Sequence, residues 1–229
     1  MAFAKPGAPL DADDQGDKKR TLAGERFRQH LLNGTLVAGS TVTQNDLAEM
    51  LGVSLTPLRE LLVLLEDQGL IEVRHRAGIT IIYPDLSFIR ENLQFRSMIE
   101  LSAIESFTIS ASEDWIREET EQHRALRDEL QSKPMQIKNY STEHFDRPFH
   151  LAMVAALGNP TIIRTYERIM DNVTLAQMVH RQQFTRAQIT DTIDEHLAIL
   201  DRVAARDADG AAQALKAHFK LSTHRIIGG

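Results

Sequence analysis

Four side chains in the second half of the sequence have the types and spacing of a metal-binding group. Asp146 and His150 are four residues apart, so both lie on one face of the helix predicted there. His196 and His218 each fall on the apolar stripe of a later predicted helix. Isolated ionisable groups are costly to bury unless they pair or bind a metal. These apolar faces therefore predict that the four side chains share one interior point.

The spacing alone leaves two other interpretations open. A histidine on an apolar face is more often a hydrogen-bonded core residue than a ligand, and an aspartate four residues from a histidine often forms a simple pair on a helix. If a metal is bound, three nitrogens and one oxygen suit zinc, nickel or manganese, and we expect zinc. The sequence has no cysteine, which excludes thiolate zinc sites and thiol nucleophiles.

Every segment beyond Pro84 has the apolar period of a helix, and the breaks between segments contain helix-capping or helix-breaking residues. The second half is therefore predicted to be an all-helical bundle of about six helices, over 86–110, 113–132, 136–157, 161–184, 190–205 and 208–226. Some histidines of this region lack a comparable pattern and are predicted to have surface or packing roles; they are His123, His144, His180 and His224.

The first half predicts three helices followed by a β-hairpin, which is the order of a winged helix-turn-helix. Apolar spacing and capping residues place the helices between Leu22 and Gly34, Thr43 and Gly52, and Ser54 and Gly69. Two short alternating runs then follow, Ile71 to Arg74 and Ile79 to Tyr83, separated by a turn that contains Gly78. The predicted fold class is thus mainly α, with a winged helix before a helical bundle.

Composition supports a chain of two globular domains and no membrane span. We expect a disordered tail over 1–17, a winged helix over 18–83 and a helical domain over 84–229. The formal net charge is -6, but residues 18–84 carry eight Lys and Arg against seven Asp and Glu, so the acidity lies outside the winged helix. The sequence has no secretory signal and no apolar run long enough to cross a bilayer, so a cytoplasmic location is expected.

The stretch LAEMLGVSLTPLRELLVLLEDQGLIEV, followed by HRAGITI, resembles the winged helix of the GntR family of regulators, and the resemblance covers residues ~22 to 82. It implies that the helix beginning near Ser54 reads operator DNA in the major groove. Two positions depart from the family pattern: Leu55 replaces an arginine that commonly reads guanine, and Asn45 replaces a frequent basic contact. Leucine packs on a thymine methyl but cannot bind guanine in bidentate fashion, so we expect a different operator.

The resemblance implies a set of DNA-contacting residues on the turn, the second helix of the motif and the wing. They are Asn45, Ser54, Leu55, Thr56, Arg59, His75, Arg76 and Gly78. In the alternative interpretation, Arg59 and Glu60 are a charged pair on a solvated helix face. Arg76 is then an ordinary surface charge of the wing.

The C-terminal region resembles the FCD effector domain, the FadR C-terminal type found on one branch of GntR regulators. The resemblance is carried by DRPFHLAMVAALGNP, then EHLAILDRVAARDADGAAQAL, then KAHF. It implies that Asp146, His150, His196 and His218 hold a divalent metal. Six helices favour the VanR-type subgroup over the seven-helix FadR type.

The same resemblance implies an effector site beside the metal. Arg96, in the pattern FRSMIE, falls where the family places an arginine that meets the effector's acid group, a task suited to its planar fork. A helix salt bridge from Arg96 to Glu100 is the alternative. Helix geometry adds Asn172 and Arg164 as further candidate contacts.

Together these features predict a homodimeric transcription regulator whose operator affinity is controlled by a small acidic metabolite next to a divalent metal. Two other functions are weighed against it. A zinc-dependent hydrolase would use the same ligands to activate water, but the sequence offers no convincing general base beside them. The second alternative function is a regulator whose metal has a purely structural role.

Overall fold

The computed structural model describes residues 12–74, 77–132, 145–179 and 184–227. The chain divides into two compact units, Met1–Tyr83 and Pro84–Gly229. Across the helices described, none is long and apolar enough to cross a membrane.

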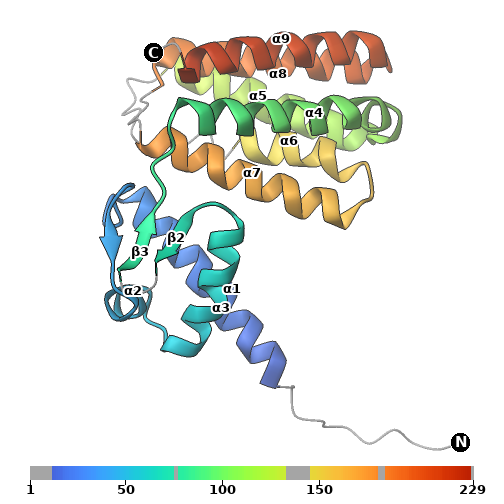
Figure 1. Ribbon diagram of the computed structural model, residues 1–229. Helices are drawn as coiled ribbons and strands as arrows, with labels where there is room; N and C mark the ends of the chain where they lie inside the picture. The colour runs from blue at the N-terminus through green and yellow to red at the C-terminus, as the bar shows by residue number, and fades with distance from the viewer. Residues whose placement is uncertain (1–11, 75–76, 133–144, 180–183, 228–229) are drawn as a thin grey trace, which may run out of the picture. The chain divides into compact units, whose positions relative to one another are not determined.

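The first unit has the predicted order of three helices and a hairpin, with one additional strand (Figure 1). Its elements are α1 (Ala12–Leu32), β1 (Thr41–Val42), α2 (Gln44–Leu51), α3 (Leu55–Asp67), β2 (Ile71–Arg74) and β3 (Gly78–Ile81). The three helices bury their apolar faces against one another, and Phe27, Leu47 and Leu58 are fully buried. The winged helix-turn-helix is therefore confirmed.

The helix α1 begins ten residues before the predicted start at Leu22, so residues 12–17 of the expected disordered tail are helical. This segment lacks an apolar period, which is why the pattern did not include it. A helix that is already nucleated by packing extends at little cost in free energy, because each added residue gains one backbone hydrogen bond. The rest of the expected tail lies outside the described residues.

Local hydrogen bonds fix both ends of α2. The Thr43 hydroxyl accepts a hydrogen bond from the backbone N–H of Asp46 at 3.1 Å, as the sequence predicts for an N-cap. At the other end of α2, Gly52 has a φ of 61° and donates its N–H to the last carbonyls of the helix. Ser54 occupies the N-cap position of α3, but its side chain makes no capping hydrogen bond.

The strands form an antiparallel sheet of order β1-β3-β2. The pairing of β2 with β3 is the predicted wing, although β3 ends at Ile81 and not at Tyr83. The strand β1 was not predicted, because two residues are too few to show an alternating pattern; it pairs Thr41 with Thr80 and Val42 with Ile79. His75 and Arg76, which follow β2 in the sequence, lie outside the described residues.

The second unit is the predicted helical bundle (Figure 1). Its helices, within the described residues, are α4 (Leu86–Ser110), α5 (Glu113–Ser132), α6 (Asp146–Ala155), α7 (Pro160–Val179), α8 (Arg186–Ala204) and α9 (Ala208–Ile227). The predicted start at residue 136 falls outside the described residues. The helix α8 begins four residues earlier than predicted, because Thr185 forms a capping box with Gln188.

The helices of this unit pack around one large apolar core. Phe149 and Met153 of α6, Ile193 of α8 and Leu215 of α9 are fully buried in it, together with side chains of α4 and α5. A smaller cluster joins α4 to α7. Figure 1 shows α8 and α9 at one side of the bundle, α4 and α5 in the middle, and α6 and α7 at the other side. Side chains from several helices therefore converge in the middle of the bundle.

Gly78 is required by the way β1 lies against β3. Its φ is 104°, and a Cβ placed on it would lie 2.7 Å from the carbonyl oxygen of Val42. We expect Gly78→Ala to lower the free energy of unfolding of the winged helix by more than the ~1 to 2 kcal/mol of a left-handed alanine, because the backbone of β1 must also move. Gly69→Ala is the matched control, since Gly69 has a φ of 71° and an added Cβ meets nothing within 4 Å. Urea melts measure the free energy of unfolding of both variants. An equal decrease in the two would show that the contact with Val42 is not the reason that a glycine is needed at position 78.

Candidate metal centre

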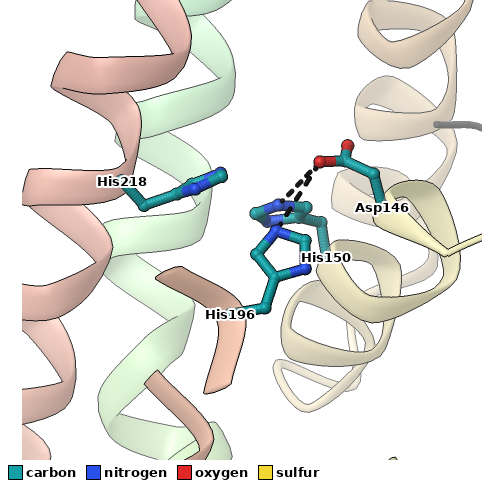
Figure 2. Close-up of side chains that lie close together, drawn as sticks. All are labelled: Asp146, His150, His196 and His218. Carbon is teal, nitrogen blue, oxygen red and sulfur yellow. Dashed lines mark ion pairs between the residues drawn. The ribbon is translucent and has the colours of Figure 1, made fainter. Parts of the chain in front are cut away.

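The structure brings together the four side chains that the sequence singled out for metal binding. Ligand atoms of Asp146, His150, His196 and His218 all lie within 4.8 Å of one another. Figure 2 shows the three imidazole rings and the carboxylate pointing toward one another. The first turn of α6 supplies Asp146 and His150, α8 supplies His196 and α9 supplies His218.

The Nε2 atoms of the three histidines are buried, and none of them has a hydrogen-bond partner among the residues that the structure describes. The rings themselves are at most 1% exposed. The nearest oxygen is Oδ1 of Asp146, at 3.5 Å from Nε2 of His150 and 3.6 Å from Nε2 of His196, which is too far for a good hydrogen bond. Three buried Nε2 atoms and Oδ1 of Asp146 thus face one point, while Oδ2 of Asp146 accepts a hydrogen bond from Arg96.

This donor set fits a divalent metal ion. Zinc lies about 2.0 to 2.1 Å from a nitrogen ligand, so two ligands on opposite sides of the ion are at most about 4.2 Å apart. The observed spread of up to 4.8 Å between ligand atoms needs only a small contraction to reach that value. Imidazole nitrogens with one carboxylate oxygen are the ligands that zinc, nickel and manganese accept.

Each histidine of the centre has its other ring nitrogen, Nδ1, in a hydrogen bond. Nδ1 of His150 donates to Oε2 of Glu100 at 2.5 Å, and Nδ1 of His218 donates to Oε2 of Glu195 at 2.8 Å. Nδ1 of His196 lies 3.0 Å from Nε2 of His123. Such bonds behind metal ligands fix the tautomer and the ring orientation, so that Nε2 is left to face the ion.

The two carboxylates behind the centre are each held by an arginine. Arg225 donates two hydrogen bonds to Glu195, at 2.8 and 2.7 Å. Arg96 donates to Oε1 of Glu100 at 2.8 Å, and the hydroxyl of Tyr166 donates to the same oxygen at 2.6 Å. Both carboxylates therefore keep their charge near the histidines, and their geometry is fixed from more than one side.

Arg96 connects this network directly to a candidate ligand. Its Nη2 lies 3.4 Å from Oδ2 of Asp146, while its Nε pairs with Glu100. The helix salt bridge that the sequence left open for Arg96 is thus present, and it is buried, because the two side chains are 3% and 0% exposed. The sequence analysis did not predict that Glu100 also forms a hydrogen bond with His150. The apolar residues around Glu100 on α4 could have indicated that this carboxylate is buried and needs such partners.

The electrostatics of the site keep both central carboxylates ionised. Burial opposes ionisation of Asp146, but the charges of Arg96 and His150 outweigh it and hold the pKa of this carboxyl well below its ordinary value. Burial likewise opposes ionisation of Glu100, but the charges of His150 and Arg96, with the hydrogen bonds from His150 and Tyr166, lower its pKa to about 2. A cation-binding centre requires this state.

Burial also acts on the histidines. It lowers the pKa of His196 well below the ordinary value, and repulsion from His218 and His150 lowers it further. Burial lowers the pKa of His218 as well, in spite of the hydrogen bond to Glu195. Burial and Arg96 also oppose protonation of His150, but Glu100 and Asp146 outweigh them and raise its pKa. Neutral imidazole is the form that binds metal, so a metal entering the centre would release any proton held by His150.

The other two predicted effector contacts, Asn172 and Arg164, have hydrogen-bond partners other than the four ligands. Asn172 on α7 is buried and donates to Oδ1 of Asn92 at 2.9 Å, while its own Oδ1 has no hydrogen-bond partner. Arg164 is exposed and donates to the hydroxyl of Thr161 on its own helix, so the geometry gives it no part in the centre. Among the remaining histidines, His224 is exposed, His144 and His180 lie outside the described residues, and His123 does more than the predicted packing, because it bonds to His196.

The predicted DNA-contacting residues are described except for His75 and Arg76. Asn45 is exposed on α2, and the start of α3 exposes Ser54, Leu55 and Thr56, with Arg59 one turn later. Gly78 is half-buried and lies against Val42 of β1. A glycine is therefore needed at this position for the packing of the sheet, whether or not it also contacts DNA.

A winged helix joined to a helical unit with a buried group of three histidines and one aspartate defines a DNA-binding regulator with a sensing domain. The FCD domain family matches residues 91–221, and the family of bacterial regulatory proteins of the gntR type matches residues 20–81. The chain therefore belongs to the gntR family, in the group of transcription regulators that carry an FCD effector domain.

Known proteins with the same organisation agree with this assignment. The HTH-type transcriptional regulator YdhC of Bacillus subtilis is 25% identical over 198 residues, which cover 85% of this chain and 84% of that protein. The Uxu operon transcriptional regulator of Escherichia coli is 26% identical over 205 residues, which cover 80% of this chain and 77% of that protein. The solved structure of E. coli McbR/YncC has a TM-score of 0.73 at 20% identity over 92% of this chain and 97% of that chain, which shows the shared fold. The VanR-type subgroup remains a prediction.

Glu100 is the carboxylate whose loss should disturb the centre most. We expect Glu100→Gln to lower the free energy of unfolding of chelator-treated protein by about 3 kcal/mol or more, because Arg96 would keep a buried charge without its partner. Glu105→Gln, an exposed position on the same helix, is the control and should change it by less than about 0.5 kcal/mol. Denaturant melts monitored by circular dichroism measure both values. A loss for Glu100→Gln as small as that of the control would contradict the assigned network.

Proposed function

We propose that this regulator binds a divalent metal at Asp146, His150, His196 and His218, and that a small carboxylate metabolite binding beside the metal controls its affinity for operator DNA. The observation that carries the proposal is the group of three buried Nε2 atoms without partners, facing one carboxylate. Buried nitrogens in this state are costly, and a metal ion is the partner that their chemistry suits.

The metal would be held by three imidazole nitrogens and one carboxylate oxygen. When bound, the ion supplies a Lewis-acidic position that accepts an anionic oxygen. Zinc is the first expectation, with nickel and manganese as alternatives, because all three accept this ligand set. The hydrogen bonds that the ligand rings donate to Glu100, Glu195 and His123 hold these rings in place in advance, which lowers the entropy lost when the metal binds.

Arg96 is the chain's own group for recognising an acid next to the metal. Its Nε is committed to Glu100 at 2.8 Å, while its Nη2 makes the longer contact of 3.4 Å to Asp146. Oδ1 of Asp146 faces the histidines and Oδ2 faces Arg96, so an effector carboxylate beside the centre would compete with Oδ2 for Nη2 of Arg96. Asn172, with an acceptor oxygen that lacks a partner, adds a possible site for a hydroxyl group of the effector.

The winged helix supplies the DNA-binding half of the proposal. The exposed start of α3, with Ser54, Leu55 and Thr56, would enter the major groove, and Arg59 would follow it one turn later. A homodimer places two such helices on two half-sites of a palindromic operator, and the effector would act by changing how the two are spaced. Sedimentation velocity of the purified protein tests the dimer.

The geometry favours a sensor over a hydrolase. A metal-dependent hydrolase needs a carboxylate or histidine beside the ligands that is free to take a proton from water. Glu100 accepts hydrogen bonds from Arg96, His150 and Tyr166. Glu195 is likewise held, by His218 and Arg225. Both nearby carboxylates thus serve to position the centre.

The central experiment separates the sensor from the hydrolase and from a purely structural metal. The operator is first selected from a random duplex library, and its affinity is then measured by fluorescence anisotropy during titration with a panel of small mono- and dicarboxylic acids, with and without chelator. We expect at least one acid to change operator affinity by tenfold or more in metal-loaded protein and to have no effect after chelation. Arg96→Lys keeps the charge but loses the planar fork, so it should weaken the response to that acid. Turnover of an acid would support the hydrolase, and operator affinity that no acid changes would support the structural metal.

Arg59 is predicted to contact the operator itself. Arg59→Ala should abolish operator retardation in gels, because one exposed arginine at the DNA-reading end of α3 is lost while the buried face of the helix is unchanged. Arg117→Ala, an exposed arginine of α5 paired with Asp114, is the matched control and should bind as the unaltered protein does. Circular dichroism checks that both variants fold. Tight operator binding by a folded Arg59→Ala protein would refute the role of Arg59.

A further inference from the structure

The helix α5 supplies none of the four candidate ligands, but it sends one histidine to the edge of the centre. His123 is 2% exposed, and its Nε2 lies 3.0 Å from Nδ1 of His196. Its other nitrogen, Nδ1, lies 2.9 Å from the backbone carbonyl oxygen of Glu119, one turn earlier on α5. Both nitrogens of His123 are therefore in hydrogen bonds, and one of the two partners is a candidate metal ligand.

The partners fix where the protons are. The carbonyl oxygen of Glu119 accepts only, so Nδ1 of His123 carries a proton and donates it. In neutral His123, Nε2 is then the acceptor, and Nδ1 of His196 must be the donor. With its proton on Nδ1, neutral His196 has its lone pair on Nε2, the buried atom that faces the centre without a partner.

The ring of His196 is also held in its plane. Phe149 stacks on it, with ring centroids 4.3 Å apart and an interplanar angle of 23°. His123 in turn packs edge-on against Phe149, with centroids 5.3 Å apart. The ring is thus held by stacking on one face and by the hydrogen bond at Nδ1.

His196 differs from the other two histidines in what lies behind it. His150 and His218 each donate to a carboxylate that is paired with an arginine. A carboxylate accepts a hydrogen bond from whichever imidazole nitrogen, Nδ1 or Nε2, is turned toward it. The neutral imidazole of His123 accepts at Nε2 alone and so accepts only from the Nδ1–H form of His196.

We infer that His123 is a positioning residue of the metal centre: it holds His196 in the Nδ1–H tautomer and orientation that present Nε2 to the ion. The inference rests on the proposed function in so far as it concerns a bound metal. His123 does not touch the ion itself and acts through His196. Through this contact α5 becomes part of the centre.

The test compares two substitutions of His123 in the full-length protein. His123→Phe keeps a ring of similar size but removes the acceptor, and it should weaken zinc binding 10- to 100-fold, as the loss of a hydrogen bond behind a ligand typically does. His123→Gln places a side-chain carbonyl oxygen near the position of Nε2, so it should restore affinity to within a few-fold of the unaltered protein. His224→Phe, at an exposed position of α9, should leave the affinity unchanged. Competition with a chromophoric chelator measures zinc affinity, and thermal melts confirm folding.

A second measurement needs no metal. In chelator-treated protein labelled with ¹⁵N-histidine, nitrogen chemical shifts report the tautomer of each imidazole. We expect His196 to be the Nδ1–H tautomer in the unaltered protein and in His123→Gln, and to lose this preference in His123→Phe. An Nε2–H tautomer in the unaltered protein would overturn the inference, and so would a folded His123→Phe protein that binds zinc as tightly as the parent. If the unaltered protein binds no zinc, nickel or manganese, the proposed function fails, while the tautomer of His196 still decides the inference about His123.

Discussion

The helical unit is organised around the burial of three imidazole nitrogens that have no hydrogen-bond partner within the described part of the chain. A buried polar atom left without a hydrogen bond costs about 1 to 3 kcal/mol. Three of them at one point therefore represent a large part of the ~5 to 15 kcal/mol by which a domain is stable. The fold tolerates this because the other side of each ring is bonded and the surrounding core is closely packed.

The surrounding charges are balanced in pairs, which keeps the interior near neutrality. Glu100 is matched by Arg96, and Glu195 is matched by Arg225. Asp146 has no such dedicated partner, since it shares Arg96 at the longer distance of 3.4 Å. The carboxylate whose charge is least compensated is thus the one that faces the three histidines, which is the arrangement that a divalent cation would complete.

The sequence predicted those parts of the protein that depend on local spacing. The four-residue interval between Asp146 and His150 and the apolar stripes of α8 and α9 were enough to predict the convergence of ligands on one point. Parts that depend on tertiary contact were missed. The strand β1 is too short to show a pattern, and the apolar period of α8 is weak near the cap at Thr185. The role of His123 could not be read from α5, because its partner lies 73 residues away in the chain.

The short strand β1 has a consequence for how such a regulator can respond. β1 ends at Val42, and α2 begins at Gln44, so a single residue, Thr43, separates the strand that pairs with the wing from the helices that read DNA. The hairpin and the helical turn are thereby joined into one stiff body, whose parts cannot shift independently without breaking the pairing between β1 and β3. A signal that moves this body as a whole would leave the pairing of β1 with β3 intact, and with it the placement of β3 beside the start of α2.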